Sequence, residues 1–221
     1  MTSRSDDVSH AELAELVGRE DAVVLEVGAN DGLDTAEMLR WYPSGRVYCF
    51  EPEPRAVAKW RARLGSHASA ELHEVALADR DGVEVFHRSG GSPRQGVADW
   101  DMSGSLLRPT GHLQYSPWCT FERSMPVTVM TLDGWRARCA PLLRRVDLWW
   151  MDVQGAEARV LRGGTDTLRK TRILKLECHR GEMYAGQATE EELLGMLSGW
   201  TCLGRYGDDL LLRNDALEDL R

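Results

Sequence analysis

The sequence contains no apolar run long enough to cross a membrane. Its uninterrupted apolar runs, such as Ala22–Leu25, fall far below the roughly 20 residues that a spanning helix needs. The first ten residues do not resemble a secretory signal peptide, because Asp6 and Asp7 stand where its apolar stretch would begin. We therefore expect a cytoplasmic protein that does not interact with membranes.

Cysteine is scarce and is not arranged for a disulfide framework or a zinc site. The chain has 5 cysteines, an odd number, and no pair has the C-x-x-C spacing. Cys49 and Cys178 lie inside apolar strand-like runs, where a free cysteine packs as a small apolar residue. The pattern predicts reduced thiols and no structural metal.

Basic residues are outnumbered. Lysine and arginine total 27 against 35 acidic residues, giving a formal charge of −8, so the overall field repels a phosphate backbone. We expect no nucleic-acid partner. Hydrophobic residues make up 43% and charged residues 28%, near the globular average, and no internal repeat is visible. At 221 residues we expect one domain, residues 1–221, with an insertion.

What the sequence does contain is an alternation of apolar strands and amphipathic helices. The predicted strands are Ala22–Val27, Arg46–Phe50, Glu71–Leu77, Val146–Asp152 and Arg172–Cys178. The predicted helices are Ser9–Gly18, Leu33–Tyr42, Pro54–Leu64, Leu132–Ala140, Ala156–Arg162 and Thr189–Leu197, followed by a hairpin of Trp200–Leu203 and Asp209–Arg213. This order predicts an α/β fold with a mostly parallel sheet covered by helices on both faces.

Two segments lie outside this alternation. Residues 1–20 carry the N-terminal helix, in which Ser9 and Glu12 form a capping box. Between the third and fourth parallel strands, strands at Val83–His87 and Pro126–Thr131 flank residues 88–123, which are polar and rich in glycine and proline. Long loops of this kind are functional or disordered, and we expect residues 88–123 to form a lid over the substrate.

The first strand ends in a glycine-containing turn, Leu25-Glu26-Val27-Gly28-Ala29-Asn30-Asp31-Gly32. A strand that passes through such a turn into a helix brings bare backbone N–H groups against a polar ligand. Asn30 occupies the second glycine position of G-x-G-x-x-G, which disfavours a pyrophosphate on the turn. The alternative is a purely structural turn.

Two acidic residues at strand ends strengthen the prediction of a nucleotide-like ligand. Glu51 directly follows the second strand and lies ~20 residues after the glycine turn. At this position an acid accepts hydrogen bonds from ribose hydroxyls. Asp152 ends the fourth strand, beside the point where strand order reverses and ligands bind. As structural alternatives, Glu51 could initiate a helix and Asp152 could cap one.

Six segments together resemble the FkbM family of S-adenosylmethionine-dependent methyltransferases. They are VLEVGANDG, YCFEPEP, VALADRDG, VTVMTLDGW, DLWWMDVQGAEARVLRGG and ILKLECHR, spread from about Val23 to Arg213. The resemblance implies a class I, Rossmann-like methyltransferase fold with seven strands ordered 3-2-1-4-5-7-6 and the last strand antiparallel. It also implies S-adenosylmethionine as cofactor and methylation of hydroxyl groups on sugars, polyketides and other secondary metabolites.

The resemblance also suggests cofactor residues. Around the methionine part it places Glu26, Gly28, Asn30 and Gly32, while Glu51 would hold the ribose. Asp31 and Asp152 are also predicted to bind the cofactor, and Asp152 is predicted to act in catalysis as well. Ala76, Leu77 and Asp79 would lie near the adenine. The chain departs from the family at one position, since Gln154 stands in D-V-Q-G-A-E where the family usually has D-V-E-G-A-E. If that acid accepts a proton or binds a metal, this chain lacks it.

An alcohol acceptor must lose a proton during methyl transfer, so a general base is expected. His179, at the end of the fifth strand beside Asp152, is the predicted base because histidine titrates near neutral pH. Period-2 alternation puts Glu177 on the same face, where it would orient the imidazole or form an ion pair. The alternative for His179 is a strand-end histidine bonded to backbone.

Substrate binding is assigned to the insert and the neighbouring strand end. The predicted residues are Trp100, Ser105, Trp118 and Glu177. Aromatic rings in the insert would stack on a sugar or polyketide; alternatively they anchor the lid. Trp149 and Trp150 lie in an apolar strand and are predicted to be core residues.

The sequence thus predicts an S-adenosylmethionine-dependent O-methyltransferase acting on a hydroxyl of a small molecule. The alternatives are N- or carboxyl methylation on the same fold, or a cofactor-binding protein without turnover. An NAD-dependent oxidoreductase is disfavoured by the missing second glycine. Metal-assisted transfer stays open because Asp152 and Glu177 could share a cation, although no spaced ligand set stands out.

Overall fold

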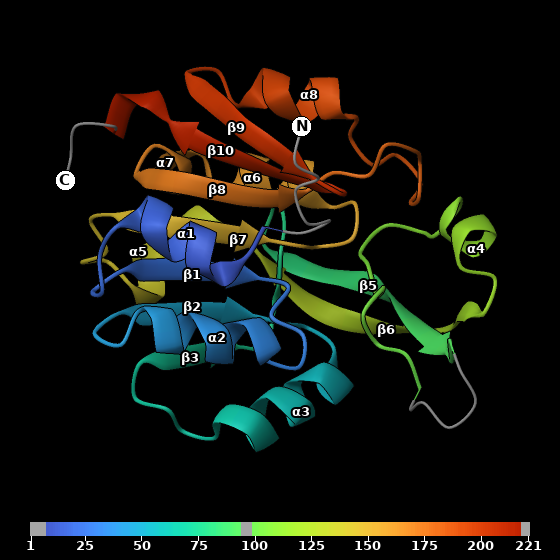
Figure 1. Cartoon of the computed structure of the whole chain (residues 1–221). Helices are drawn as coiled ribbons and strands as arrows, with labels where there is room; N and C mark the ends of the chain where they lie inside the picture. The colour runs from blue at the N-terminus through green and yellow to red at the C-terminus, as the bar shows by residue number, and fades with distance from the viewer. Residues whose placement is uncertain (1–7, 94–98, 218–221) are drawn as a thin grey trace.

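The computed structural model describes residues 8–93 and 99–217, and its centre is a seven-stranded sheet (Figure 1). The strands run in the order β3 (Ala70–His73), β2 (Arg46–Phe50), β1 (Val23–Val27), β7 (Val146–Met151), β8 (Thr171–Glu177), β10 (Asp209–Asn214) and β9 (Trp200–Tyr206). Neighbouring strands from β3 to β8 pair in parallel, whereas β10 is antiparallel to both β8 and β9. The predicted 3-2-1-4-5-7-6 order, with its antiparallel last strand, is confirmed.

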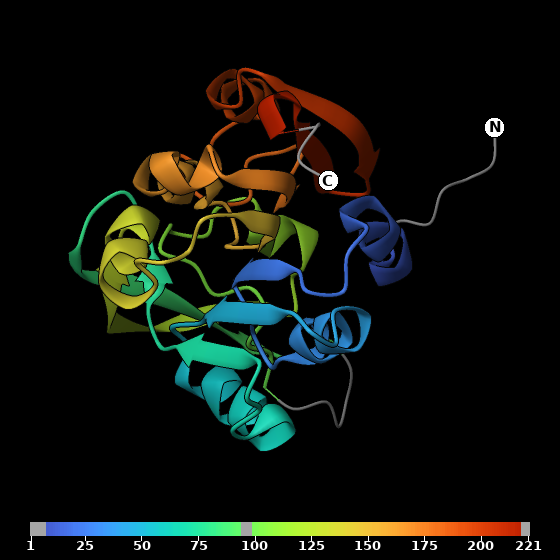
Figure 2. The ribbon, with the colours of Figure 1, turned by 90° about the vertical axis from the view of Figure 1, so that its left-hand side faces the viewer.

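Helices cover both faces of this sheet (Figure 2). One face carries α1 (His10–Val17), α2 (Leu33–Trp41) and α3 (Pro54–Leu64); the other carries α5 (Leu132–Cys139), α6 (Glu157–Gly163), α7 (Thr165–Leu168) and α8 (Glu190–Met196). Because side chains alternate along a strand, neighbouring residues pack into the cores on opposite faces of the sheet. Trp149 packs in the core under α5 and α6, and Trp150 belongs to the core under α1 and α2.

The helix ends follow their sequence signals. The Ser9 backbone N–H and hydroxyl donate to Glu12 at 3.0 and 2.8 Å, and the Glu12 N–H donates back to the Ser9 hydroxyl at 3.2 Å. Thr189 and Glu192 form the same capping box at the start of α8. Both boxes satisfy N–H groups that the first helical turn leaves unpaired, and both predictions are confirmed.

The segment between β3 and β7 contains a second sheet. It consists of β4 (Ala76–Leu77), β6 (Cys119–Met130) and β5 (Gly82–Gly91), with α4 (His112–Tyr115) between β5 and β6. In Figure 1 β5 and β6 project beyond the end of the main sheet. The fold-class prediction of an insertion after the third parallel strand is confirmed.

Two expectations for this region are wrong. The predicted single strand Glu71–Leu77 is two strands, because β3 pairs with β2 whereas β4 pairs with β6. The predicted loop 88–123 is partly a β-hairpin, in which β5 extends to Gly91 and β6 begins at Cys119. Most residues of this hairpin are partly or fully exposed, so apolar alternation does not reveal it. Residues 94–98 of the expected lid lie outside the described part of the chain.

No helix within residues 8–93 and 99–217 has the length and apolar character that crossing a bilayer requires.

Candidate active site

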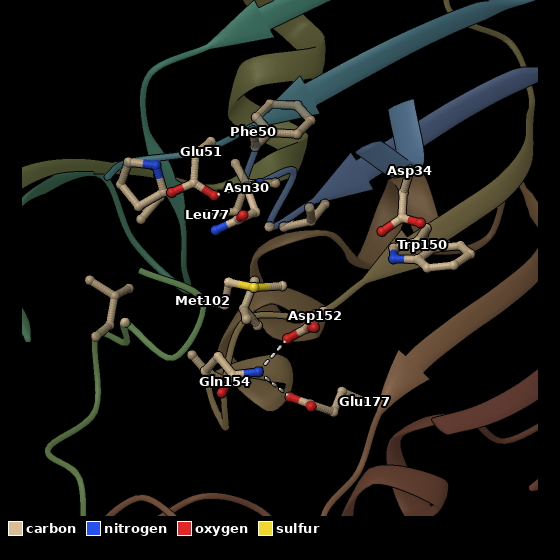
Figure 3. A pocket seen from close by; sticks show the side chains of 18 of the residues that line it. Asn30, Asp34, Phe50, Glu51, Leu77, Met102, Trp150, Asp152, Gln154 and Glu177 are labelled. Atoms are coloured by element: carbon tan, nitrogen blue, oxygen red, sulfur yellow. Dashed lines mark hydrogen bonds between the residues drawn. The ribbon is translucent and has the colours of Figure 1, made fainter. Parts of the chain in front are cut away.

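A cavity of about 350 Å³ lies at the carboxyl ends of β1, β2, β7 and β8. Phe86 of β5 and four residues of the insert close it from the opposite side; the insert residues are Asp101, Met102, Gly104 and Leu106. Figure 3 shows Glu51 and Leu77 toward one end, Asp152, Gln154 and Glu177 toward the other, and Met102 between them. Ligand pockets in proteins commonly have this size and this mixture of apolar walls and a few polar groups.

The glycine turn brings the ends of three strands together. Gly28 adopts φ +89°, and a Cβ added there would lie 1.8 Å from the carbonyl oxygen of Asp152. Its N–H donates to the Phe50 carbonyl at 3.0 Å, while the Asp152 N–H donates to Val27 at 2.9 Å. Glycine is therefore required because the backbones of β1 and β7 approach too closely for any side chain.

Glu51 provides a buried carboxylate at one end of the cavity. Its two oxygens accept backbone N–H groups from Asn30 at 2.9 Å and from Glu53 at 2.8 Å, which fix its orientation. Burial raises the pKa of Glu51 to about 7, and the nearby charges of Glu53 and Asp101 also raise it. The carboxylate retains lone pairs that hydroxyl groups in the cavity can reach.

Next to Glu51 the wall is apolar. It is formed by Phe50, Val75, Ala76, Leu77 and Phe86. Asn30 ties this region to the insert, because its Nδ2 donates to the Asp101 carbonyl at 3.2 Å and the Asp101 carboxylate pairs with Lys59 at 2.7 Å. An apolar slot beside a carboxylate has the chemistry to accept a planar base and its ribose.

The opposite end holds two acids joined by an amide. Gln154 Nε2 donates to Asp152 Oδ1 at 2.7 Å and to Glu177 Oε2 at 2.8 Å. Burial raises the pKa of Glu177 well above its usual range, and the charge of Asp152 raises it further. Glu157, the last acid of D-V-Q-G-A-E, lies beneath the loop and accepts the N–H groups of Val153 and Gly155, both at 3.2 Å.

His179 lies behind this acid pair and does not line the cavity. Its Nε2 is 3.4 Å from Glu177 Oε2 and its Nδ1 is 3.3 Å from Asp208 Oδ2. Burial alone would lower the pKa of His179, but the contacts and charges of Glu177 and Asp208 raise it to about 9. The imidazole is therefore protonated at neutral pH, which argues against the predicted role of His179 as general base.

We call the side arm the part of the cavity that is lined by residues on the α1 and α2 side of the sheet. Its lining includes Asp34, Trp150, Lys175, Tyr206, Asp208 and Asp209. Lys175 Nζ lies 4.0 Å from the centre of the Trp150 ring and 2.5 Å from Asp209 Oδ2. His10 of α1 stacks on Trp150, with ring centres 5.3 Å apart. The arm presents hydrogen-bond donors and acceptors side by side.

Four predicted cofactor residues do not line the cavity: Glu26, Asp31, Gly32 and Asp79. Glu26 is buried on the α2 side of the sheet, where the Thr35 hydroxyl and the Cys49 thiol donate to it. Asp31 pairs with Arg63, and Asp79 pairs with Arg159. Gly32 begins α2. Gly28, Asn30, Glu51, Ala76, Leu77 and Asp152 do line the cavity.

Of the four predicted substrate residues, one lines the cavity and three do not. Glu177 lines the cavity, but Trp100 and Trp118 pack edge to face against each other, with ring centres 5.0 Å apart, away from it. Ser105 lies behind the wall and donates to the Gln154 carbonyl at 2.8 Å. The aromatic pair thus anchors the insert, as in the structural alternative.

Several lining residues went unrecognised in the sequence. Trp150 was predicted to be core, yet its edge borders the cavity although it is only 6% exposed. Lys175, a charged residue inside an apolar strand, was a visible signal for a paired or functional group. Asp101 and Met102 directly precede the Ser103-Gly104-Ser105 stretch, but only the folded chain brings them to the cavity.

Among residues 8–93 and 99–217, no group of three or more histidine, cysteine or acidic side chains is arranged to hold a metal ion. Near the acid pair, the third position of such a group is occupied by the Gln154 amide.

Comparison with known proteins agrees with a nucleotide-like ligand in this cavity. Residues 26–207 match the model of the methyltransferase FkbM domain. The chain belongs to the FkbM methyltransferase family. The 2-O-methyltransferase NoeI of Sinorhizobium fredii is 37% identical over 212 residues, covering 94% of this chain and 86% of NoeI. The AMB antimetabolite synthetase AmbE of Pseudomonas aeruginosa is 31% identical over 89% of this chain, which spans only 10% of AmbE.

Solved structures support the fold of this FkbM methyltransferase. An FkbM methyltransferase from Methylobacillus flagellatus superposes with a TM-score of 0.52 at 13% identity, covering 88% of this chain and 43% of that structure. A putative rRNA methylase from Clostridium thermocellum superposes with a TM-score of 0.50 at 10% identity, covering 96% of both chains. At these identities the likeness shows the class I, Rossmann-like methyltransferase fold alone.

S-adenosylmethionine is the cofactor of this FkbM methyltransferase, and the cavity fits it. Glu51 would offer a carboxylate to the ribose hydroxyls, Phe50 and Leu77 would border the adenine, and Asp152 at the far end would favour the positive sulfonium.

Proposed function

We propose that the protein transfers a methyl group from S-adenosylmethionine to a hydroxyl group of a small molecule such as a sugar, a polyketide or another secondary metabolite. The observation that carries this proposal is one cavity with the buried carboxylate of Glu51 at one end and the half-buried pair Asp152 and Glu177 at the other. The name of the relative NoeI, a 2-O-methyltransferase, supports oxygen as the acceptor atom.

Glu177 is the proposed proton acceptor. It borders the cavity, whereas His179 lies behind it and holds a proton at neutral pH. S-adenosylmethionine supplies an electrophilic methyl group on a positively charged sulfur. The chain's own contribution is to align the acceptor hydroxyl and to receive its proton on a Glu177 oxygen, with the His179 imidazolium 3.4 Å away to favour the ionised carboxylate.

The side arm is the proposed acceptor site. Counting the acid pair, five carboxylates line this part of the cavity: Asp34, Asp152, Glu177, Asp208 and Asp209. Lys175 pairs with Asp209, and His179 pairs with Glu177. This excess of negative charge opposes phosphorylated or carboxylated acceptors. Hydroxyl groups both donate and accept hydrogen bonds, so they match the neighbouring Lys175 and Asp208. Together with the chain's formal charge of −8, this favours an uncharged small molecule over nucleic acid.

The insert, residues 88–123, is proposed to act as the lid of one methyltransferase domain, because Asp101, Met102, Gly104 and Leu106 border the cavity opposite the strand ends. A cytoplasmic location is part of the proposal: all five cysteines are free, as in a reducing compartment.

Ligand-induced stabilisation followed by methyl transfer tests the proposal. S-adenosylhomocysteine at 100 times its dissociation constant should stabilise the protein by about 2.7 kcal/mol, which is roughly 5–10 °C in Tm for a chain of this size. Glu51→Gln should bind it at least tenfold more weakly, with the exposed Glu37→Gln as the matched control. Stabilisation by NAD and not by S-adenosylhomocysteine would refute cofactor use.

Transfer of a labelled methyl group is then measured on pairs of compounds, each a neutral hydroxylated molecule and its phosphate ester. We expect the neutral member of a pair to be methylated, and Trp150→Phe to raise its KM while leaving S-adenosylhomocysteine binding unchanged. Labelling of amines or carboxylates alone would favour the N- or carboxyl-methylation alternative. Cofactor binding without transfer to any class would favour a binding protein.

A further inference from the structure

One amide nitrogen separates two half-buried acids in this site. Gln154 Nε2 is 2.7 Å from Asp152 Oδ1 and 2.8 Å from Glu177 Oε2, and both contacts are drawn in Figure 3. Asp152 directly follows β7 and Glu177 ends β8, and Gln154 joins the two carboxylates. Its Oε1 lies 2.8 Å from the hydroxyl of Tyr184, a fully buried residue, whose single proton is shared between this oxygen and the Ser103 carbonyl.

Two carboxylate oxygens that converge on one point need something positive between them. A metal ion, a shared proton or an ammonium group can fill this role, and an unpaired buried charge is strongly destabilising. The amide of glutamine supplies two N–H donors from a single atom and so satisfies both oxygens without binding an ion. A glutamate at this position, which the family usually has, would instead place a third carboxylate against the other two.

The backbone holds Gln154 in this place. The residue adopts φ +54°, a left-handed conformation that non-glycine residues rarely adopt. Its carbonyl accepts the Ser105 hydroxyl at 2.8 Å, and the Tyr184 hydroxyl is 2.9 Å from the Ser103 carbonyl. The backbone of Gln154 is thus held by the insert, and its side-chain amide is held by the acid pair.

We propose that Gln154 is a positioning residue that takes the place of a cation or shared proton between Asp152 and Glu177, and thereby keeps the acid pair assembled without a metal ion. The consequence for catalysis, that Glu177 stays aligned to receive the acceptor's proton, rests on the proposed function. The structural claim does not, and it can be tested without knowing the acceptor.

The test compares the Tm of the wild type and Gln154→Glu, a near-isosteric change that adds one carboxylate. In EDTA at pH 8 we expect the variant to melt roughly 5 °C or more below the wild type. The gap should shrink at pH 5.5, where a proton can be shared, or on addition of Mg²⁺ or Mn²⁺, which can bind three carboxylates. The wild type should gain nothing from either ion.

Two results would overturn the proposal: Gln154→Glu melting with the wild type at pH 8 in EDTA, or Mn²⁺ stabilising the wild type as much as the variant. If Gln154→Glu does not fold, the double variant Asp152→Asn with Gln154→Glu decides, because it returns the site to two acids and one amide. We expect it to be more stable than Gln154→Glu, and equal instability would contradict the proposal.

Activity gives a separate readout. Once an acceptor is known, wild-type transfer should persist in EDTA, whereas Gln154→Glu should lose transfer in EDTA and regain part of it with Mn²⁺. Failure of this arm alone, with the stability results as expected, would count against the assignment of Glu177 as proton acceptor and not against the amide bridge.

Discussion

Glu177 and His179 lie two residues apart at one strand end, yet their surroundings give them different roles. The carboxylate borders the cavity, and burial together with Asp152 raises its pKa. The imidazole, held between Glu177 and Asp208, keeps its proton up to about pH 9 because those contacts outweigh the effect of burial on its pKa. A group that already holds its proton cannot accept the acceptor's, and His179 does not line the cavity, so the Glu177 carboxylate that borders it is the better candidate.

This assignment predicts a difference between two variants. Glu177→Gln should lower kcat by roughly 10²- to 10⁴-fold, the usual contribution of a general base. His179→Gln should retain activity, but loss of the neighbouring positive charge raises the pKa of Glu177, so the rising limb of the rate should move to higher pH. The measurement is kcat from pH 6 to 10 at saturating acceptor. Abolished transfer in His179→Gln with little effect of Glu177→Gln would reverse the assignment.

At the scale of elements, the insert packs against β5 of the second sheet at a glycine. A Cβ added at Gly104 would lie 2.6 Å from the Phe86 ring, and both residues line the cavity. Gly104→Ala should therefore displace residues 101–106 and weaken S-adenosylhomocysteine binding about tenfold, a cost within the range for overpacking. Gly181→Ala is the matched control, since nothing lies within 4 Å of its added Cβ. Isothermal titration compares them; equal affinities would show that this closure does not shape the cofactor site.

The elements themselves were largely predictable, because apolar periodicity and capping residues are local signals. The boundaries of β2 and α3 coincide with the prediction, and Glu51 was identified from its distance along the chain after the glycine turn. The position of Trp150 was not predictable in this way. Trp149 and Trp150 have the same apolar neighbours, and only the packing of α1 and β8 decides which ring borders the cavity.

The insert shows the same limit more strongly. Trp100 and Trp118 are 18 positions apart in a polar segment, and their mutual contact depends on the exposed pairing of β5 with β6. Aromatic composition indicated stacking but not the partner. His179 was predicted as base from the ordinary pKa of histidine, whereas the flanking Asp208 comes from the β9–β10 turn, 29 positions away.

At the scale of the whole molecule, buried carboxyls set the pH dependence of stability. Burial raises the pKa values of Glu26 to about 8, and of Glu51 and Glu157 to about 7. A group whose pKa is higher in the folded state binds more protons there than in the unfolded chain, so stability falls as pH rises from about 4.5 through these values. The raised pKa of His179 acts in the same direction between about pH 6.5 and 9.

Arg88 and Arg55 lower the pKa of Glu53 against the effect of burial. This shift makes stability rise as the pH rises toward 4.5, and it has no effect on stability between pH 6.5 and 8.5. Burial lowers the pKa values of His73 and His112, which makes stability rise with pH only up to about 6.5. Above pH 6.5 the lowered pKa values of Glu53, His73 and His112 no longer make stability rise with pH. The free energy of unfolding should therefore be lower at pH 8.5 than at pH 6.5.

Glu26→Gln isolates the largest of these contributions away from the catalytic residues. Glu26 is almost fully buried against Thr35 and Cys49, and each unit of pKa shift corresponds to about 1.4 kcal/mol. The variant should lose on the order of 3 kcal/mol less than the wild type between pH 5.5 and 8.5 in urea unfolding. Glu37→Gln, an exposed carboxyl paired with Arg40, should keep the wild-type slope. An unchanged slope in Glu26→Gln would mean that this carboxyl is ionised at little cost in the folded protein.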